Sequence, residues 1–185
     1  MRLFIAISFP ESELRAIGDL MAMVKSKLPP ASWVRPETQH LTFAFLGEQP
    51  ESLLKTLEPS VEESLSGVPR FEGRLRGSGF FPNPRHARVG WVGAGPEEKF
   101  RAVADAVRAG VKAAGVTLDG ADFRPHLTLF RIRNPWPPAC IEIFNSALRD
   151  YKSDPFPVDA VTLFSSQLDP KGAIHTPLRT FALAT

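Results

Sequence analysis

The sequence predicts an α+β fold made mainly of antiparallel sheet, on the basis of three observations. Short segments rich in β-forming residues alternate with segments whose apolar residues recur at helical spacing. Several links between neighbouring strand segments are too short to contain the crossover helix that parallel strands need. No Ser/Gly-rich linker or low-complexity segment divides the chain, so we expect a single domain over residues 1–185.

The first half of the chain is expected to contain two strands and two helices. Apolar residues from Leu14 to Leu28 recur at three- and four-residue steps and stop at a Pro-Pro pair, which predicts an amphipathic helix. A second set with this spacing contains Pro59, where we expect the helix to weaken or bend. In order, a strand, a helix, an extended piece, a strand and a helix are expected at residues 2–9, 14–28, 31–36, 38–46 and 53–65.

The second half is expected to add a hairpin, a helix, a strand, a short helix and a final strand pair. Pro82 to Arg85 has the composition of a turn between two strands. Pro96 near its start and Gly115 just after its end delimit the third helix. In order, these elements are expected at residues 70–80, 86–93, 96–114, 123–132, 139–150, 156–166 and 173–183.

The composition narrows the class of protein. Hydrophobic residues make up 43% of the chain and charged residues 23%, which argues against a disordered protein. The formal net charge of +2 permits an anionic partner without requiring one. No apolar run approaches the ~18 residues of a membrane-spanning helix, so no membrane partner is expected. The single Cys140 cannot form an intramolecular disulfide, which fits a reducing cytoplasm.

A tetrapeptide occurs twice, although the chain has only four histidines. His-Leu-Thr-Phe at residues 40–43 recurs as His-Leu-Thr-Leu at residues 126–129, and each copy falls in an expected strand. Because successive side chains of a strand point to opposite faces, the histidine and the threonine of each copy share one face. The two leucines then anchor the strands in the core. If the two strands meet, one concave face holds two imidazoles and two hydroxyls.

Such a face suits acid–base chemistry at a phosphate ester. An imidazole has a reference pKa of about 6.5, so one ring can be neutral while its neighbour is protonated. The neutral ring takes a proton from an attacking water, and the protonated ring gives a proton to the leaving oxygen. Hydroxyls and cations can hold the remaining phosphate oxygens. His40 and His126 are therefore the candidate catalytic residues, with Thr42 and Thr128 beside them.

Arg131 is a candidate phosphate ligand, and a metal site is the main rival interpretation. Arg131 lies five residues after His126, so a regular strand would place it on the opposite face, unless a bulge or the strand end redirects it. A metal would need a third and a fourth ligand. The motifs offer no carboxylate or thiol on the His/Thr face, and HExxH and CxxC patterns are absent, so no metal and no cofactor are expected.

The residues around both motifs resemble a known family. Trp33 to Gly47 and Phe123 to Arg131 are similar to the two motifs of the two-histidine (2H) phosphoesterase superfamily. Within it they resemble the RNA 2′,3′-cyclic phosphodiesterases, also described as 2′-5′ RNA ligase-like proteins. The likeness spans nearly the whole chain, including Arg2 to Ala6 and the hairpin from Gly79 to Gly93. It implies a bilobal, pseudo-two-fold fold with outer helices and a central cleft, each lobe contributing one motif.

The resemblance also implies an activity and roles for the site residues. The activity is the metal-independent opening of a terminal 2′,3′-cyclic phosphate to a 2′-phosphate, on RNA ends or nucleoside 2′,3′-cyclic phosphates. His40 would be the general acid and His126 the general base, although the near-symmetry of the motifs leaves these roles exchangeable. Thr42, Thr128 and Arg131 would bind the phosphate. We expect a cytoplasmic monomer.

Two other functions remain open. The same site could run in reverse and join a 2′,3′-cyclic end to a 5′-hydroxyl, or the protein could bind RNA ends without turning them over. The family often has a tyrosine after its C-terminal glycine, whereas this chain has His175 three residues after Gly172. We interpret His175 as a surface or hairpin histidine.

A basic segment and the aromatic residues near the motifs are weaker signals. The segment from position 70 to position 88 contains five arginines and only one glutamate. These arginines form either a rim that attracts an RNA backbone or a solvated strand face. They are Arg70, Arg74, Arg76, Arg85 and Arg88. Strand alternation places Phe45 on the face of Phe43, away from His40, which argues against Phe45 as a stacking surface for a base.

Overall fold

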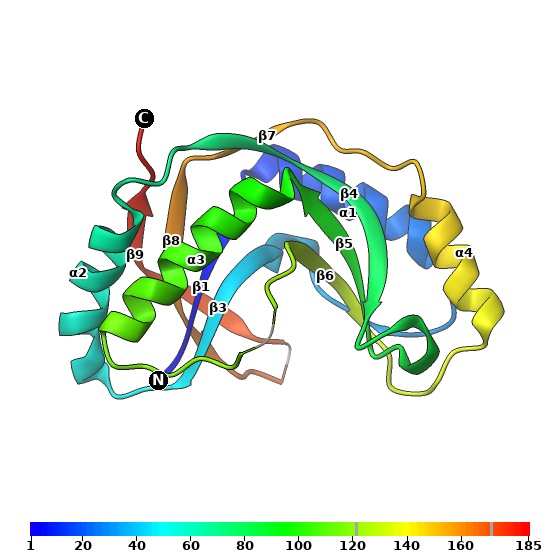
Figure 1. Ribbon diagram of the computed structural model, residues 1–185. Helices are drawn as coiled ribbons and strands as arrows, with labels where there is room; N and C mark the ends of the chain where they lie inside the picture. Colours follow the sequence, from blue (N-terminus) through cyan, green and yellow to red (C-terminus); the bar gives the residue numbers. More distant parts are fainter. Residues whose placement is uncertain (121, 171) are drawn as a thin grey trace.

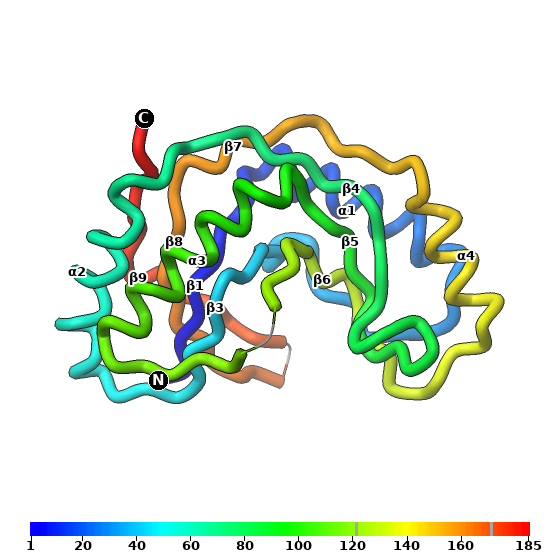
Figure 2. The backbone as a smooth tube through the Cα atoms, viewed as in Figure 1, coloured from blue at the N-terminus to red at the C-terminus, as the bar shows by residue number. Residues whose placement is uncertain are grey.

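Two antiparallel sheets form the frame of the protein, and helices cover their outer sides (Figure 1). The computed structural model describes residues 1–120, 122–170 and 172–185. Figure 2 shows that the backbone curves as an arch, with β3 and β6 next to each other on its inner side. Because these two strands carry the two His-Leu-Thr motifs, the arch brings distant parts of the chain together.

Each sheet contains one motif. The first sheet has the strand order β3-β1-β8-β9. Its strands are, in that order, His40–Glu48, Arg2–Ser8, Ala160–Gln167 and Ile174–Ala182. The second sheet has the order β2-β6-β5-β4-β7. Its strands are Ser32–Trp33, His126–Arg131, Val89–Gly95, Phe71–Phe81 and Phe156–Val158. All strand pairs within both sheets are antiparallel, which confirms the expected fold class.

Four α-helices and three short 3₁₀ helices complete the fold within the described residues. The α-helices α1 to α4 are Glu11–Lys25, Leu54–Leu65, Glu97–Ala113 and Pro138–Leu148. The 3₁₀ helices η1 to η3 are Pro36–Thr38, Glu51–Leu53 and Pro84–His86. The α-helices follow the expected positions closely, and α2 continues through Pro59. Within the part of the chain that the structure describes, none of the helices has both the length and the apolar character that crossing a bilayer requires.

The last strand pair differs from its sequence-based prediction. Residues 156–166 were expected to form one strand, but the chain forms β7 and β8 on either side of Asp159. β7 pairs with β4 of the second sheet, and β8 pairs with β1 and β9 of the first. The chain therefore changes sheets at Asp159, whose carbonyl accepts a hydrogen bond from the Leu183 amide at 2.8 Å.

The helices are held by apolar stripes that pack on the sheets. In α3, Phe100, Val103, Val107 and Val111 lie on one side of the helix and are fully buried. α3 contacts α2, β3 and β5, and α4 contacts β4. One continuous cluster of buried apolar residues extends through both sheets, so the positions of β3 and β6 relative to each other are set by a shared core.

Both motif-bearing strands carry a β-bulge directly after the threonine. In the β1–β3 pair, Thr42 and Ala44 face consecutive residues of β1, and Phe43 has no partner. In the β5–β6 pair, Thr128 and Phe130 face consecutive residues of β5, and Leu129 has no partner. An extra residue in one strand reverses the alternation of its side chains beyond that point.

The bulges correct the expected side of Phe45 and decide between the two sides left open for Arg131. Each strand has two consecutive buried residues after its threonine. The next residue, Phe45 or Arg131, is exposed on the face that carries the histidine and threonine of the same strand. The expectation that Phe45 shares the face of Phe43 is therefore wrong, and Arg131 lies on the face of His126. Phe45 and Arg131 occupy equivalent positions in the two strands, five residues after the histidine.

Gly90 provides a test of how tightly the second bulge is packed. It pairs with Phe130, and a Cβ at Gly90 would overlap the buried Phe130 ring. We expect Gly90→Ala to lower the free energy of unfolding by about 1–3 kcal/mol, because the ring must shift. Urea denaturation measures the loss. Gly67→Ala is the matched control, since its Cβ would meet nothing within 4 Å. Equal losses in both variants would contradict this packing argument.

Candidate active site

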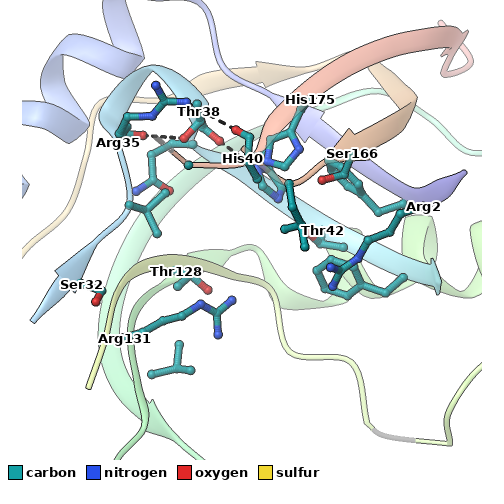
Figure 3. Close-up of a pocket in the computed structure, with 18 of the residues that line it drawn as sticks. Arg2, Ser32, Arg35, Thr38, His40, Thr42, Thr128, Arg131, Ser166 and His175 are labelled. Carbon is teal, nitrogen blue, oxygen red and sulfur yellow. Dashed lines mark hydrogen bonds between the residues drawn. The ribbon is translucent and has the colours of Figure 1, made fainter. Parts of the chain in front are cut away.

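A cavity of about 620 Å³ lies between the two motif-bearing strands (Figure 3). All five residues that the sequence predicted for the site line this cavity. His40 and Thr42 come from β3, and His126, Thr128 and Arg131 come from β6. The structure thus brings the two tetrapeptides together across one pocket.

Each motif histidine is anchored in the same way. The Nδ1 of His40 lies 2.9 Å from the carbonyl oxygen of Thr38, and the Nδ1 of His126 lies 2.7 Å from that of Arg124. A carbonyl only accepts hydrogen bonds, so each Nδ1 carries the proton and donates it. The bonds therefore leave Nε2 of each ring as the nitrogen that exchanges protons with a substrate.

The backbone positions of these anchors follow from the residues before each motif. Thr38 ends η1, which begins at Pro36, and the chain turns from there into β3. Pro125 restricts Arg124 to extended conformations, and the Arg124 carbonyl contacts Nδ1 of His126. In both motifs the accepting carbonyl belongs to the residue two positions before the histidine.

Aromatic rings hold the imidazoles from the side. The ring centroids of Phe4 and His40 are 4.9 Å apart, and those of Phe81 and His126 are 4.8 Å apart. Trp91 adds a further ring beside His126, with centroids 6.1 Å apart. These contacts limit the rotation of both imidazoles and exclude water from one side of each ring.

Burial lowers the pKa of both histidines, and neighbouring positive charges lower the pKa of His126 further. Burial is the main cause for His40, and the hydrogen bond to Thr38 opposes it. Burial also lowers the pKa of His126, the bond to Arg124 opposes it, and the charges of Arg124, His40 and Arg131 lower it further. A phosphate anion in the pocket would act in the opposite direction, because a negative charge favours the imidazolium form.

His175 is a third imidazole in the pocket, and our interpretation as a surface histidine did not place it there. It lies on β9 opposite Ser166, and its ring centroid is 5.1 Å from that of His40 and 4.9 Å from that of Phe4. Burial lowers its pKa, and the charges of His40 and Arg35 lower it further. Its Nδ1 is buried without a hydrogen-bond partner among the described residues.

Two arginines that sequence reasoning missed add positive charge to the pocket. Arg2 projects from β1, and Arg35 precedes η1 and donates from Nη2 to the Ala173 carbonyl at 3.4 Å. With Arg131, three guanidiniums line the cavity, while none of the described lining residues is Asp or Glu. The period-two pattern of β1 places Arg2 and Phe4 on one face, and this signal could have identified Arg2. The pocket is therefore suited to an anionic ligand.

Phe45 offers a flat apolar surface on the same pocket. It lines the cavity and is 64% exposed, an unusual exposure for a phenylalanine. The bulge at Phe43 brings it to this face, and no sequence signal revealed that bulge.

The basic segment between positions 70 and 88 divides into parts with different surroundings. Arg74 donates from Nη1 to the Ser153 carbonyl at 3.0 Å, and the guanidinium of Arg76 lies against Gly95. These two arginines belong to β4 and do not line the cavity. Arg85 and Arg88 lie in the connection between β4 and β5.

Within residues 1–120, 122–170 and 172–185, no group of three or more His, Cys, Asp or Glu side chains is placed to hold a metal ion.

The fold and pocket define an α+β protein in which each of two antiparallel sheets presents one carbonyl-anchored histidine to a shared cavity. A family model described as the 2′-5′ RNA ligase superfamily matches residues 10–170. The chain therefore belongs to this superfamily, which confirms the family likeness inferred from the two motifs.

Individual relatives match over nearly their full lengths. A protein of Methanothermobacter thermautotrophicus, named RNA 2′,3′-cyclic phosphodiesterase, is 30% identical over 183 residues, covering 99% of both chains. One of Thermus thermophilus with the same name is 35% identical over 191 residues, covering 99% of this chain and 90% of the relative.

Solved structures share the fold. The protein TT0787 of Thermus thermophilus superposes with a TM-score of 0.78 and 32% identity, covering 99% of this chain and 98% of that one. Escherichia coli LigT complexed with 3′-AMP superposes with a TM-score of 0.75 and 27% identity, covering 98% and 97%.

Removing the charge of His40 should raise the pKa of both neighbouring histidines. The protonated His40 lowers the pKa of His126 and of His175 by repulsion, so His40→Phe, which keeps a ring in place, should move both titrations to higher pH. NMR titration of the imidazole carbon-bound protons measures this, and His86, outside the pocket, provides the reference resonance. Unchanged titrations of both histidines would show that the three rings are not coupled.

Proposed function

We propose that the protein is an RNA 2′,3′-cyclic phosphodiesterase that opens a terminal 2′,3′-cyclic phosphate to a 2′-phosphate. The observation that supports this most directly is the pair of carbonyl-anchored imidazoles, one from each sheet, in a cavity lined by three arginines. Relatives with this name match nearly the whole chain at about 30% identity. A phosphate is an anion, and the positive lining of the cavity suits it.

The reaction needs one proton acceptor and one proton donor on opposite sides of the phosphate. Nε2 of His126 takes a proton from water, and the water oxygen forms a bond to phosphorus. The bond from phosphorus to the 3′ oxygen breaks, and Nε2 of protonated His40 gives its proton to that oxygen. The products are a 2′-phosphate and a 3′-hydroxyl. Exchange of one proton between each imidazole and solvent restores the starting state.

The charges around the two rings support this division of roles. Arg124 and Arg131 lower the pKa of His126 beyond the effect of burial, and a lower pKa favours the neutral form that acts as a base. The pKa of His40 is lowered by burial without such a contribution from an arginine. His40 lacks this contribution, so the negative charge of an incoming phosphate favours its protonated form, as a general acid requires.

The remaining lining residues have roles that their chemistry defines. The hydroxyls of Thr42 and Thr128 lie on the motif faces and donate to the two non-bridging oxygens. The guanidinium of Arg131 balances their negative charge. Phe45 supplies a surface on which the terminal base stacks, since every base has a π-face and Phe45 is exposed on the site side.

Hydrolysis of a nucleoside 2′,3′-cyclic phosphate tests the proposal. We expect phosphorus NMR to show a 2′-monophosphate, with or without a chelator. His40→Ala and His126→Ala should each lower kcat/KM by at least about 10²-fold, because each removes one proton transfer. His86→Ala, which lies outside the pocket, should keep full activity.

Several results would contradict this function. A 3′-monophosphate product, dependence on a chelatable metal, or loss of activity in only one of the two motif variants would each be inconsistent with the two-histidine reaction. Tight binding of RNA ends without turnover, retained in both variants, would instead support an RNA-end-binding module. Joining of a 2′,3′-cyclic end to a 5′-hydroxyl RNA, followed on gels, would support a ligase at the same site.

The proposed stacking on Phe45 has its own test. Phe45→Ala should raise KM for a nucleoside 2′,3′-cyclic phosphate, because a stacked base is worth about 1–3 kcal/mol. kcat should change little, since Phe45 has no part in proton transfer, and Phe45→Tyr should keep the native KM. Steady-state kinetics on ribose 2′,3′-cyclic phosphate, which lacks a base, is the decisive control. An equal rise in KM for that substrate would show that Phe45 does not bind the base.

A further inference from the structure

Four exposed arginines form a basic surface at one end of the pocket. Arg85 and Arg88 lie in the connection from β4 to β5, and Arg131 and Arg133 lie at the end of β6 and just beyond it. We call these four residues the basic rim. In Figure 1 the two segments that carry them lie beside each other, where the chain turns from β4 into β5.

Hydrogen bonds fix the first segment of the basic rim. The side-chain oxygen of Asn83 accepts from the amides of Arg85 and His86, each at 3.0 Å, and so begins η3. The amide of Arg88 donates to the Phe81 carbonyl at 2.8 Å, which closes the connection. A segment held in this way presents its arginines without a large loss of conformational freedom on binding.

The two segments are joined to each other and to the pocket. The Arg88 carbonyl accepts from the Ile132 amide at 2.8 Å, and the Arg88 guanidinium donates to the Arg133 carbonyl at 3.0 Å. Phe81 and Arg131, which adjoin these contacts, line the catalytic cavity. The basic rim is therefore continuous with the place where the terminal phosphate would lie.

The charge of the basic rim is not neutralised within the part of the chain that the structure describes. The ion pairs found there use the N-terminus, Arg15, Arg101, Arg149 and Arg179, and none uses a rim arginine. The neighbouring helix α4 carries Glu142, but its carboxylate is engaged by Arg149 and Ser146. Unpaired guanidiniums beside a phosphate site match a ligand with several phosphates.

We propose that the basic rim binds the phosphodiester backbone of the RNA chain next to its terminal cyclic phosphate. This inference rests on the proposed function and extends it. The cavity takes the terminal nucleotide, and the rim takes the phosphates that precede it. An RNA oligomer is then a better substrate than a mononucleotide, and the advantage decreases as salt rises, because phosphate contacts release counterions.

Charge reversal at two rim arginines tests the rim without changing the catalytic pocket. The test variant is Arg85→Glu with Arg133→Glu, which leaves Arg131 in the cavity and the Arg88 contact to the backbone of residue 133 in place. The control is Lys55→Glu with Lys112→Glu, which makes the same charge change on α2 and α3. Both are compared on a nucleoside 2′,3′-cyclic phosphate and on an oligouridylate that ends in a 2′,3′-cyclic phosphate.

We expect the test variant to lose about tenfold or more in kcat/KM on the oligomer at low salt and to keep native kcat/KM on the mononucleotide. The slope of log kcat/KM against log salt should also become shallower by about 0.7 for each phosphate contact removed. Equal losses on both substrates, an equal loss in the control, or an unchanged slope would overturn the proposal.

A failure of the proposed function would be recognised separately. If neither substrate is hydrolysed, fluorescence anisotropy with an oligouridylate ending in a 2′-phosphate still tests the surface. Weaker binding of this RNA by the test variant than by the control supports the rim as an RNA site. Equal binding by both overturns it.

Discussion

One unpaired residue in each of two strands determines how the pocket is built. Phe43 and Leu129 have no partner in the neighbouring strand, so the alternation of side chains reverses after each threonine. Each strand then buries two residues in succession and returns its next side chain to the site face. Without these bulges Phe45 and Arg131 would point into the core, and each motif would present only its histidine and threonine.

The two halves of the pocket share one geometry and differ in charge. In both, a backbone carbonyl two residues before the histidine fixes Nδ1, and a phenylalanine packs beside the ring. At the equivalent position after the bulge, one half has the ring of Phe45 and the other the guanidinium of Arg131. Near-symmetry therefore supplies two similar imidazoles, while the arginine at this one position is among the charges that lower the pKa of His126.

Burial and positive charge act in the same direction on the imidazoles of this pocket. Burial and like charges favour neutral imidazoles, while three arginines attract an anion. In the proposed reaction, the negative charge of the phosphate favours the protonated form of His40. The positive charge of the pocket continues from Arg131 to Arg85, Arg88 and Arg133, and this continuity is the basis of the proposal that the surface binds an RNA backbone.

The α+β class, nearly all of the elements and the two His-Leu-Thr motifs could be predicted from the residues alone, because hydrophobic periodicity and a repeated rare residue are local signals. Alternation over two positions also placed Thr42 and Thr128 on the faces of their histidines, and both line the cavity. The sides taken by Phe45 and Arg131 and the place of His175 depend on contacts between strands that are distant in the sequence. A bulge arises from pairing with another strand, and His175 meets His40 only because β9 joins β1 through β8, so neither is visible in the residues nearby.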